Sequence, residues 1–253
     1  MKKLLIISFI VFAAGYSPAQ VSRFQGLVQE ANQYYSDSKY TEAIAAYEEV
    51  LAGNYESAAL YFNLGNAYFK VNNIPSAIWN YEKALKLDPT DKDIRFNLDL
   101  ANSRVIDKIE PLPEFFLKTW IRSLRDMASS NSWAKIGLFT MVLALAFAFI
   151  FTISRSISFR KISFWSGLVM LFIMGLAFIF STSSYRHYHR QNTGIIFNPT
   201  VTVKSSPSEN SVDLFVIHEG AKVFILDRVE GWSEIKLANG NVGWLKTTSY
   251  KPV

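Results

Sequence analysis

The sequence contains no cysteine among its 253 residues. This absence excludes disulfide bonds, metal sites built on thiolates and a cysteine nucleophile. Histidine is scarce, with three residues in the whole chain. A catalytic or metal site that depends on histidine therefore has few places to lie.

Those histidines form no recognisable site. His187 and His189 are two residues apart, a spacing that does not put both on one face of a helix, and His218 precedes a Glu-Gly turn. No phosphate-binding loop, zinc signature or nucleophile elbow is present in the sequence. The sequence therefore predicts a protein that is not an enzyme and has no catalytic residue, no metal ligand and no cofactor.

Negative charge is scarce in one part of the chain. The formal net charge is +5, and residues 108–190 carry ten bases against three acids. These residues also contain two long apolar stretches, Ile136–Ile153 and Ile162–Phe180. A basic excess around apolar spans suits anionic lipid headgroups, whereas nucleic-acid binding would require a basic face on a folded domain. We predict contact with membrane lipid and none with nucleic acid.

The apolar stretches predict how the chain lies in the membrane. Residues 1–19 have the order of a secretory signal peptide, and an uncleaved anchor is the alternative. Two transmembrane helices are expected at 134–153 and 162–182, since each is long enough to cross the hydrocarbon core. The positive-inside rule favours the cytoplasm for the loop between them, 154–161; its basic residues are Arg155, Arg160 and Lys161. Basic residues before the first span compete with this loop, so the signal peptide, which delivers the N-terminal domain outside, decides the orientation. We predict a multi-pass protein of a bacterial inner membrane with both soluble parts in the periplasm.

Residues 108–133 lead into the first span. After Pro111 and Pro113, one helical face carries apolar residues that include Trp120. The opposite face carries Lys118, Arg122 and Arg125. A basic amphipathic helix with tryptophan on its apolar side is expected to lie among lipid headgroups. Packing of this helix on the preceding domain is the alternative.

Residues 24–91 repeat with a period of 34. The shift superposes Ala31 on Gly65, Ala43 on Ala77 and Tyr47 on Tyr81. On this pattern of small and aromatic residues, the segment resembles the tetratricopeptide repeat family. We place repeats at 24–57 and 58–91 and a capping helix at 92–107, within an all-α domain at 20–107.

Four asparagines recur within these repeats. Asn32 and Asn66 are equivalent, and so are Asn63 and Asn97. In the family resembled, the first helix of each repeat lines a concave face on which asparagines bind peptides. The basic positions of the family's carboxylate-binding clamp hold Val28, Asp93 and Asn97 here, so a chaperone tail is not the expected ligand. Two roles stay open for the asparagines, lining a protein-binding groove or bonding neighbouring helices.

Residues 195–253 change to short alternating segments. Val223–Leu226 and Ser233–Leu237 alternate, and Asn239-Gly240 is typical of a hairpin turn. With Gly231-Trp232 and Gly243-Trp244, the segment resembles a bacterial SH3 domain, a small all-β barrel. Trp232 and Trp244 either line a ligand groove of that barrel or form its edge and core.

The order of segments resembles the BatE family of Bacteroides aerotolerance proteins over essentially the full chain, above all in LPEFFLKTWIRSLRDMASSNSWAKIGL. The resemblance implies von Willebrand A-domain membrane proteins as partners and a link to oxidative or envelope stress. The chain is thus expected to be a multi-domain membrane protein that joins tetratricopeptide repeats, a transmembrane hairpin and an SH3-like barrel. Its expected function is a non-enzymatic adaptor, and the alternative is a cell-wall tether that binds peptidoglycan through the barrel.

Overall fold

The structure is a computed structural model that describes residues 18–189 and 192–253. The predicted signal peptide at 1–19 lies almost entirely outside the described residues. The chain divides into two compact units, residues 1–56 and residues 57–253. We describe each unit by itself.

The first unit consists of helices α1 (Pro18–Ser36) and α2 (Tyr40–Ala52). Ala31 and Ala43 are fully buried where the two helices pack, and Tyr47 is 1% exposed beside them. These are three of the positions that the 34-residue period singled out. Small residues at these positions allow the two helix backbones to approach, and the tyrosine fills the space beside them.

The second unit begins with helices α3 (Ala58–Lys70), α4 (Ile74–Leu87) and α5 (Lys92–Asn102). Each starts at a side-chain cap, because Ser57, Asn73 and Asp91 accept bonds from backbone amides of the first turn. Gly65 lies against Tyr81, and a β-carbon there would be 2.7 Å from the tyrosine ring. The absence of a side chain at Gly65 therefore allows α3 and α4 to pack closely.

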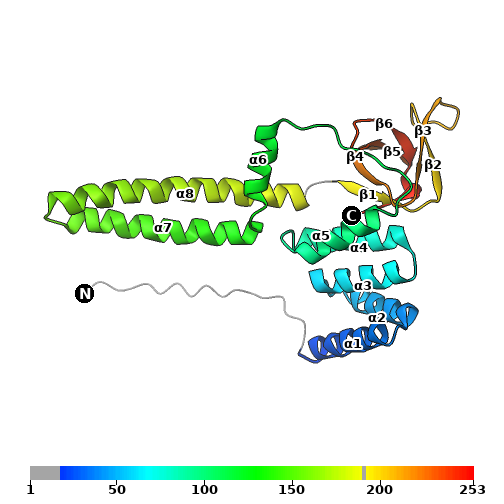
Figure 1. The fold of residues 1–253 in the computed structure, drawn as a ribbon, viewed down its shortest axis with the longest axis horizontal. Helices are drawn as coiled ribbons and strands as arrows, with labels where there is room; N and C mark the ends of the chain where they lie inside the picture. Colours follow the sequence, from blue (N-terminus) through cyan, green and yellow to red (C-terminus); the bar gives the residue numbers. More distant parts are fainter. Residues whose placement is uncertain (1–17, 190–191) are drawn as a thin grey trace. The chain divides into compact units, whose positions relative to one another are not determined.

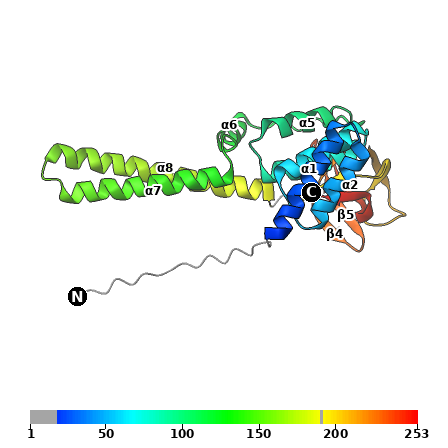
Figure 2. The same cartoon turned by 90° about the horizontal axis from the view of Figure 1, so that it is seen from below.

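After α5 come helix α6 (Phe116–Arg125) and two long helices, α7 (Ser130–Ile153) and α8 (Ile157–His189). The long helices lie side by side and antiparallel (Figures 1 and 2). At one end Ser130 and Ser181 each donate to the other's backbone carbonyl, at 3.0 and 2.9 Å. Alanines 144 and 177 are buried between the helices, as small residues are in close helix pairs.

Both long helices are long and apolar enough to cross a membrane. Of the apolar window in each, 17% is buried in α7 and 11% in α8. The core helix of a soluble protein would bury most of such a surface. The turn between them is residues 154–156, shorter than the loop expected at 154–161, because Arg160 and Lys161 continue the helix as part of α8.

The chain ends in a seven-stranded antiparallel sheet, which we call the β domain (residues 193–253). Its strands are β1 (Thr193–Ile196), β2 (Thr200–Lys204), β3 (Asp213–His218), β4 (Lys222–Val229), β5 (Trp232–Lys236), β6 (Val242–Lys246) and β7 (Tyr250–Pro252), with a short 3₁₀ helix η1 (Thr247–Ser249) before the last strand. They are ordered β3-β2-β6-β5-β4-β1-β7. The predicted alternation holds in β4 and β5, whose buried residues Val223, Ile225 and Ile235 join one apolar core.

The predicted Asn-Gly turn joins β5 to β6. Gly240 has a φ of +92°, a left-handed conformation that glycine adopts at no steric cost. The amide of Leu237 donates to the carbonyl of Asn241 at 2.9 Å and closes the hairpin. The expected fold class, with a helical repeat region, an apolar helical hairpin and a small β domain, agrees with the structure.

Candidate protein-binding site

Asn32 of the first unit bonds the two helices of its repeat. Its Oδ1 accepts a hydrogen bond from the hydroxyl of Tyr47 at 2.6 Å. Tyr47 is otherwise buried, so this bond satisfies the one polar group that its ring carries into the core. Asn32 itself is exposed, so the residue takes part in packing while it also meets solvent.

Asn66 makes the same bond in the second unit, 34 residues later. Its Oδ1 accepts from the hydroxyl of Tyr81 at 2.8 Å and also from Nδ2 of Asn97 at 2.8 Å. One asparagine therefore connects helices α3, α4 and α5. Both lone pairs of this oxygen already accept hydrogen bonds. A ligand that bonds the Asn66 side chain would therefore accept a hydrogen bond from its amide NH₂ group.

Asn63 lies one helical turn before Asn66 and is half-buried, as is Asn97. The structure thus brings Asn66 and Asn97 into direct contact and puts Asn63 on the same helix, while Asn32 belongs to the other unit. Bonding between helices accounts for Asn32, Asn66 and Asn97. Whether the asparagines also line a groove for a partner stays a prediction.

Two apolar residues of α5 were not singled out from the sequence. Phe96 is 68% exposed and Leu100 is 42% exposed, and they lie one helical turn apart. A capping helix usually turns a polar face to solvent, so exposed apolar residues on its outer side are unusual. The sequence contains a signal for them, because Phe62–Leu64 (FNL) recurs at Phe96–Leu98. This recurrence marks the start of a third repeat that does not continue into a second helix.

The two tryptophans of the β domain lie on the sheet face opposite its core. Along β5 and β6 the buried residues are Ser233, Ile235, Gly243 and Leu245, and the alternating positions between them point outward. Trp232 and Trp244 occupy such outward positions and are half-buried. Neither belongs to the core cluster.

Helix α6 presents its apolar side outward. Trp120 is 60% exposed and Ile121 is 46% exposed. On its other side, Lys118 and Arg122 form ion pairs with Glu114, at 3.1 and 2.8 Å. These cations hold the pKa of the Glu114 carboxyl below its ordinary value, chiefly through their hydrogen bonds to it.

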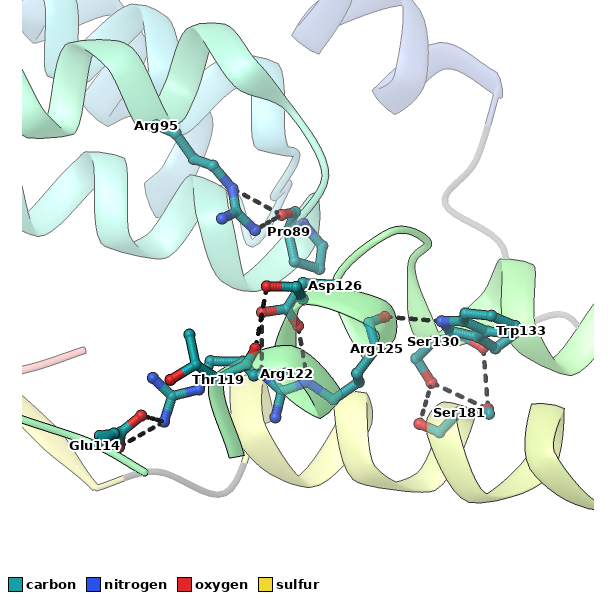
Figure 3. Close-up of polar contacts among 11 residues, drawn as sticks. Pro89, Arg95, Glu114, Thr119, Arg122, Arg125, Asp126, Ser130, Trp133 and Ser181 are labelled. Carbon is teal, nitrogen blue, oxygen red and sulfur yellow. Dashed lines mark hydrogen bonds and ion pairs between the residues drawn. The ribbon is translucent and has the colours of Figure 1, made fainter. Parts of the chain in front are cut away.

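Arg125 differs from the other two predicted headgroup-binding cations. It is 8% exposed, and its guanidinium forms two bonds with Asp126, at 2.7 and 3.1 Å. Its backbone carbonyl accepts a bond from the indole of Trp133 at 2.8 Å, which attaches α6 to the start of α7 (Figure 3). The geometry therefore gives Arg125 a role in joining the two helices.

The three basic residues between the long helices are exposed. Arg155 lies in the turn, while Arg160 and Lys161 lie in the first turns of α8. The Arg160 guanidinium also sits 5.0 Å from the centre of the Phe151 ring, a cation–π contact at the end of α7.

The histidines lie apart. His218 Nδ1 is 2.9 Å from Asp107, whose second carboxylate oxygen accepts the His218 backbone amide at 2.6 Å. His187 lies near the end of α8, and the side chain of His189 is outside the described residues. Among the side chains that the structure describes, no group of three acids, histidines or cysteines could hold a metal ion.

Known proteins resemble this chain over its repeats. The tetratricopeptide repeat model matches residues 58–91, and a TPR repeat model matches residues 31–72. Sperm-associated antigen 1 of Rattus norvegicus is 35% identical over 78 residues, which is 31% of this chain and 9% of that protein. The Hsp70-Hsp90 organizing protein of Triticum aestivum is 34% identical over 62 residues, 24% of this chain and 11% of that protein.

The chain therefore spans about a tenth of the length of these curated relatives, and the similarity concerns the repeats alone. Within the matched segment the structure shows helix pairs packed through buried alanine, glycine and tyrosine residues, so the fold of this segment agrees with the match in sequence. Residues 31–91 consist of tetratricopeptide repeats, which makes this part of the chain a scaffold for protein–protein interaction.

Proposed function

We propose that the protein is a membrane-anchored adaptor without enzymatic activity, whose repeats hold a protein partner at α5. The observation that carries this proposal is that the exposed residues Phe96 and Leu100 occupy positions that are packed against the next helix in the preceding repeat. By the 34-residue shift they correspond to Phe62 and Asn66 of α3. Both of those residues contact α4, Phe62 through a ring contact with Tyr81 at 6.0 Å and Asn66 through its hydrogen bond.

Helix α5 therefore presents the face on which the next helix of a repeat would pack. In the described chain, the residues that follow α5 are not helical before Phe116. The occupant we propose is an amphipathic helix of a partner protein that takes the place of this missing helix. Asn97 follows Phe96 on α5, so a polar side chain borders this apolar face.

The test uses exposed residues, so that folding is preserved. We expect Phe96→Ala with Leu100→Ala to abolish recovery of the partner in cross-linked co-purification from native membranes. The matched control is Asp99→Asn, an exposed position of the same helix. Equal recovery with the double variant and the control would refute the site.

The asparagine groove is tested separately. Asn63→Ala is expected to weaken partner recovery if the side chain contacts the partner. Asn32→Ala and Asn66→Ala are expected to lower stability as well, because each removes the acceptor of a buried tyrosine hydroxyl. Loss of stability without loss of the partner would assign these asparagines to helix bonding alone.

The identity of the partner is proposed from resemblance. The similarity to the BatE family supports von Willebrand A-domain membrane proteins as partners, within an aerotolerance or envelope-stress complex. The relative from Triticum aestivum is named for organizing Hsp70 and Hsp90, a role that belongs to that protein. In this chain, the positions that are basic in the family's carboxylate clamp hold Val28, Asp93 and Asn97.

We further propose a bacterial inner-membrane location with both soluble parts in the periplasm. The signal-like residues 1–19, the two candidate spans, and Arg155, Arg160 and Lys161 in and just after the turn between the spans support this arrangement. An alkaline phosphatase fused after Val253 is expected to be active. An inactive fusion would contradict the two-span arrangement.

A cell-wall tether is the second candidate function, and the outward tryptophans of the β domain favour it. If residues 195–253 are an SH3-like domain, Trp232 and Trp244 offer aromatic surface to a peptidoglycan peptide. Trp232→Ala is then expected to reduce sedimentation with isolated cell wall. Val242→Ala, on the same outer face of β6, is the control and is expected to sediment as the wild type does.

A further inference from the structure

A cavity of about 270 Å³ lies within the second unit, at the end of α8. Its lining comes from α4, α5, α6, the last turns of α8 and strands β1 and β4. We call it the basic cavity. It goes beyond the proposed function, because none of the asparagines or tryptophans discussed above lines it. Its size is just below the range of about 300–1,000 Å³ of small-molecule pockets.

The lining carries an excess of positive charge. Two lysines and two arginines line the cavity, Lys86, Arg95, Arg122 and Lys222, against the two carboxylates of Glu82 and Asp126. Both carboxylates have cations of their own. Glu82 pairs with Lys222 at 2.7 Å, and Asp126 pairs with Arg125, which lies behind the wall. Lys222 is one of the four lining cations, and Arg122, another of them, pairs with Glu114 outside the lining. With Arg125 and Glu114 included, cationic groups still outnumber carboxylates around the cavity.

The cations are held in place by the fold. The guanidinium of Arg95 donates from Nε and Nη2 to the carbonyl of Pro89, at 3.2 and 2.5 Å (Figure 3). Arg122 is oriented by Glu114, and Lys86 donates to the backbone oxygen of Val253 at 2.6 Å. Burial lowers the pKa of Lys86, with a further contribution from Lys83. An anion in the cavity would offset this burial of charge.

We propose that the basic cavity binds a phosphate group. The N–H groups of guanidinium are suitable hydrogen-bond donors to phosphate oxygens, and the lysines add point charges. His187, the last residue of the second candidate span, lines the cavity. A phosphate group there belongs either to an anionic lipid headgroup or to a soluble phosphate compound, and the chemistry of recognition is the same for both.

The experiment uses the full chain and two probes. Inorganic phosphate is titrated calorimetrically into the protein in detergent. It is also titrated into the protein in nanodiscs of phosphatidylcholine, with or without phosphatidylglycerol. Retained phosphatidylglycerol is counted by native mass spectrometry. We expect Lys86→Gln to weaken phosphate binding or lipid retention about tenfold, as loss of one charged contact does. Lys86→Arg is expected to restore it.

Lys92→Gln is the matched control, because Lys92 is exposed on α5 and does not line the cavity. Phosphate binding that is lost only in discs with phosphatidylglycerol supports a lipid headgroup as the ligand. Phosphate binding that is equal in both discs supports a soluble phosphate. If Lys86→Gln and Lys92→Gln are indistinguishable with both probes, the proposal is overturned. The partner-recovery test with Phe96 and Leu100 is independent of this result.

Discussion

At the scale of single residues, Gly65 shows how closely a repeat is packed. A β-carbon at this position would lie 2.7 Å from two ring atoms of Tyr81, which is 1% exposed and has no room to move away. Gly65→Ala is therefore expected to lower the free energy of unfolding by about 1–3 kcal/mol, as overpacking does, even though alanine favours helix. Denaturant unfolding followed by circular dichroism measures it.

Gly26 provides the comparison for this variant. It lies in α1, is exposed, and a β-carbon there would meet nothing within 4 Å. Gly26→Ala is expected to be neutral or to stabilise by about 0.5–1 kcal/mol through helix propensity. If both variants unfold alike, the close approach of α3 and α4 is not present in solution.

The hydroxyl of Tyr81 gives a second prediction at this scale. Tyr81→Phe removes its bond to Asn66 and is expected to cost about 0.5–1.5 kcal/mol, a moderate amount because Asn66 keeps its contact with Asn97. Thermal unfolding checks this. Tyr40→Phe is the control, since the Tyr40 hydroxyl makes a long, exposed contact of 3.4 Å. An equal effect of both changes would contradict a structural role for the asparagine–tyrosine pair.

At the scale of elements, the sequence predicted what depends on periodicity. The repeat helices, the two apolar helices and the hairpin at Asn239-Gly240 all follow from spacing or from turn chemistry that neighbouring residues determine. Contacts between distant residues were not predictable in this way. Asp107 and His218, for example, are 111 residues apart, and only the fold brings them within hydrogen-bonding distance.

The basic cavity was hidden from sequence reasoning for the same reason. Lys86 and Arg95 lie on the consecutive helices α4 and α5, but Arg122 and Lys222 come from α6 and β4, much later in the chain. Each alone is an ordinary surface cation, and only the fold brings the four together. The exposed residues Phe96 and Leu100 differ, because the 34-residue shift itself relates them to packed positions of α3. A position-by-position comparison of the incomplete third repeat with α3 therefore predicts them from the sequence.

Glu114 gives a prediction for helix α6. Its folded-state pKa lies below the ordinary value of 4.5, so its contribution to stability is full above that value and is lost as pH falls through the folded-state pKa. A carboxyl-carbon NMR titration is expected to show a midpoint below 4.5. Lys118→Gln should move this midpoint upward, whereas Lys108→Gln should not. A midpoint indifferent to Lys118 would show that the pair does not persist.

At the scale of the whole molecule, hydrogen bonds and an ion pair attach the β domain to the helices of the second unit. Asp107, just after α5, accepts the backbone amide and the ring nitrogen of His218. The indole of Trp79 donates to the carbonyl of Pro252 at 2.9 Å, and Lys222 pairs with Glu82. These groups come from α4, the residues after α5 and three strands. The β domain thus has polar anchors on the same unit that carries the proposed partner face.

Asp107 is the anchor whose loss is expected to separate these parts. Asp107→Ala leaves the His218 amide without its acceptor and is expected to cost about 1–3 kcal/mol, because the carboxylate is 16% exposed and makes both bonds. Limited proteolysis of the full chain should then cut residues 103–115 faster, and the thermal transition should broaden or split. Asp99→Ala, an exposed acid of α5, should behave as the wild type does. Equal cleavage of the two variants would mean that Asp107 does not hold the β domain to the repeats.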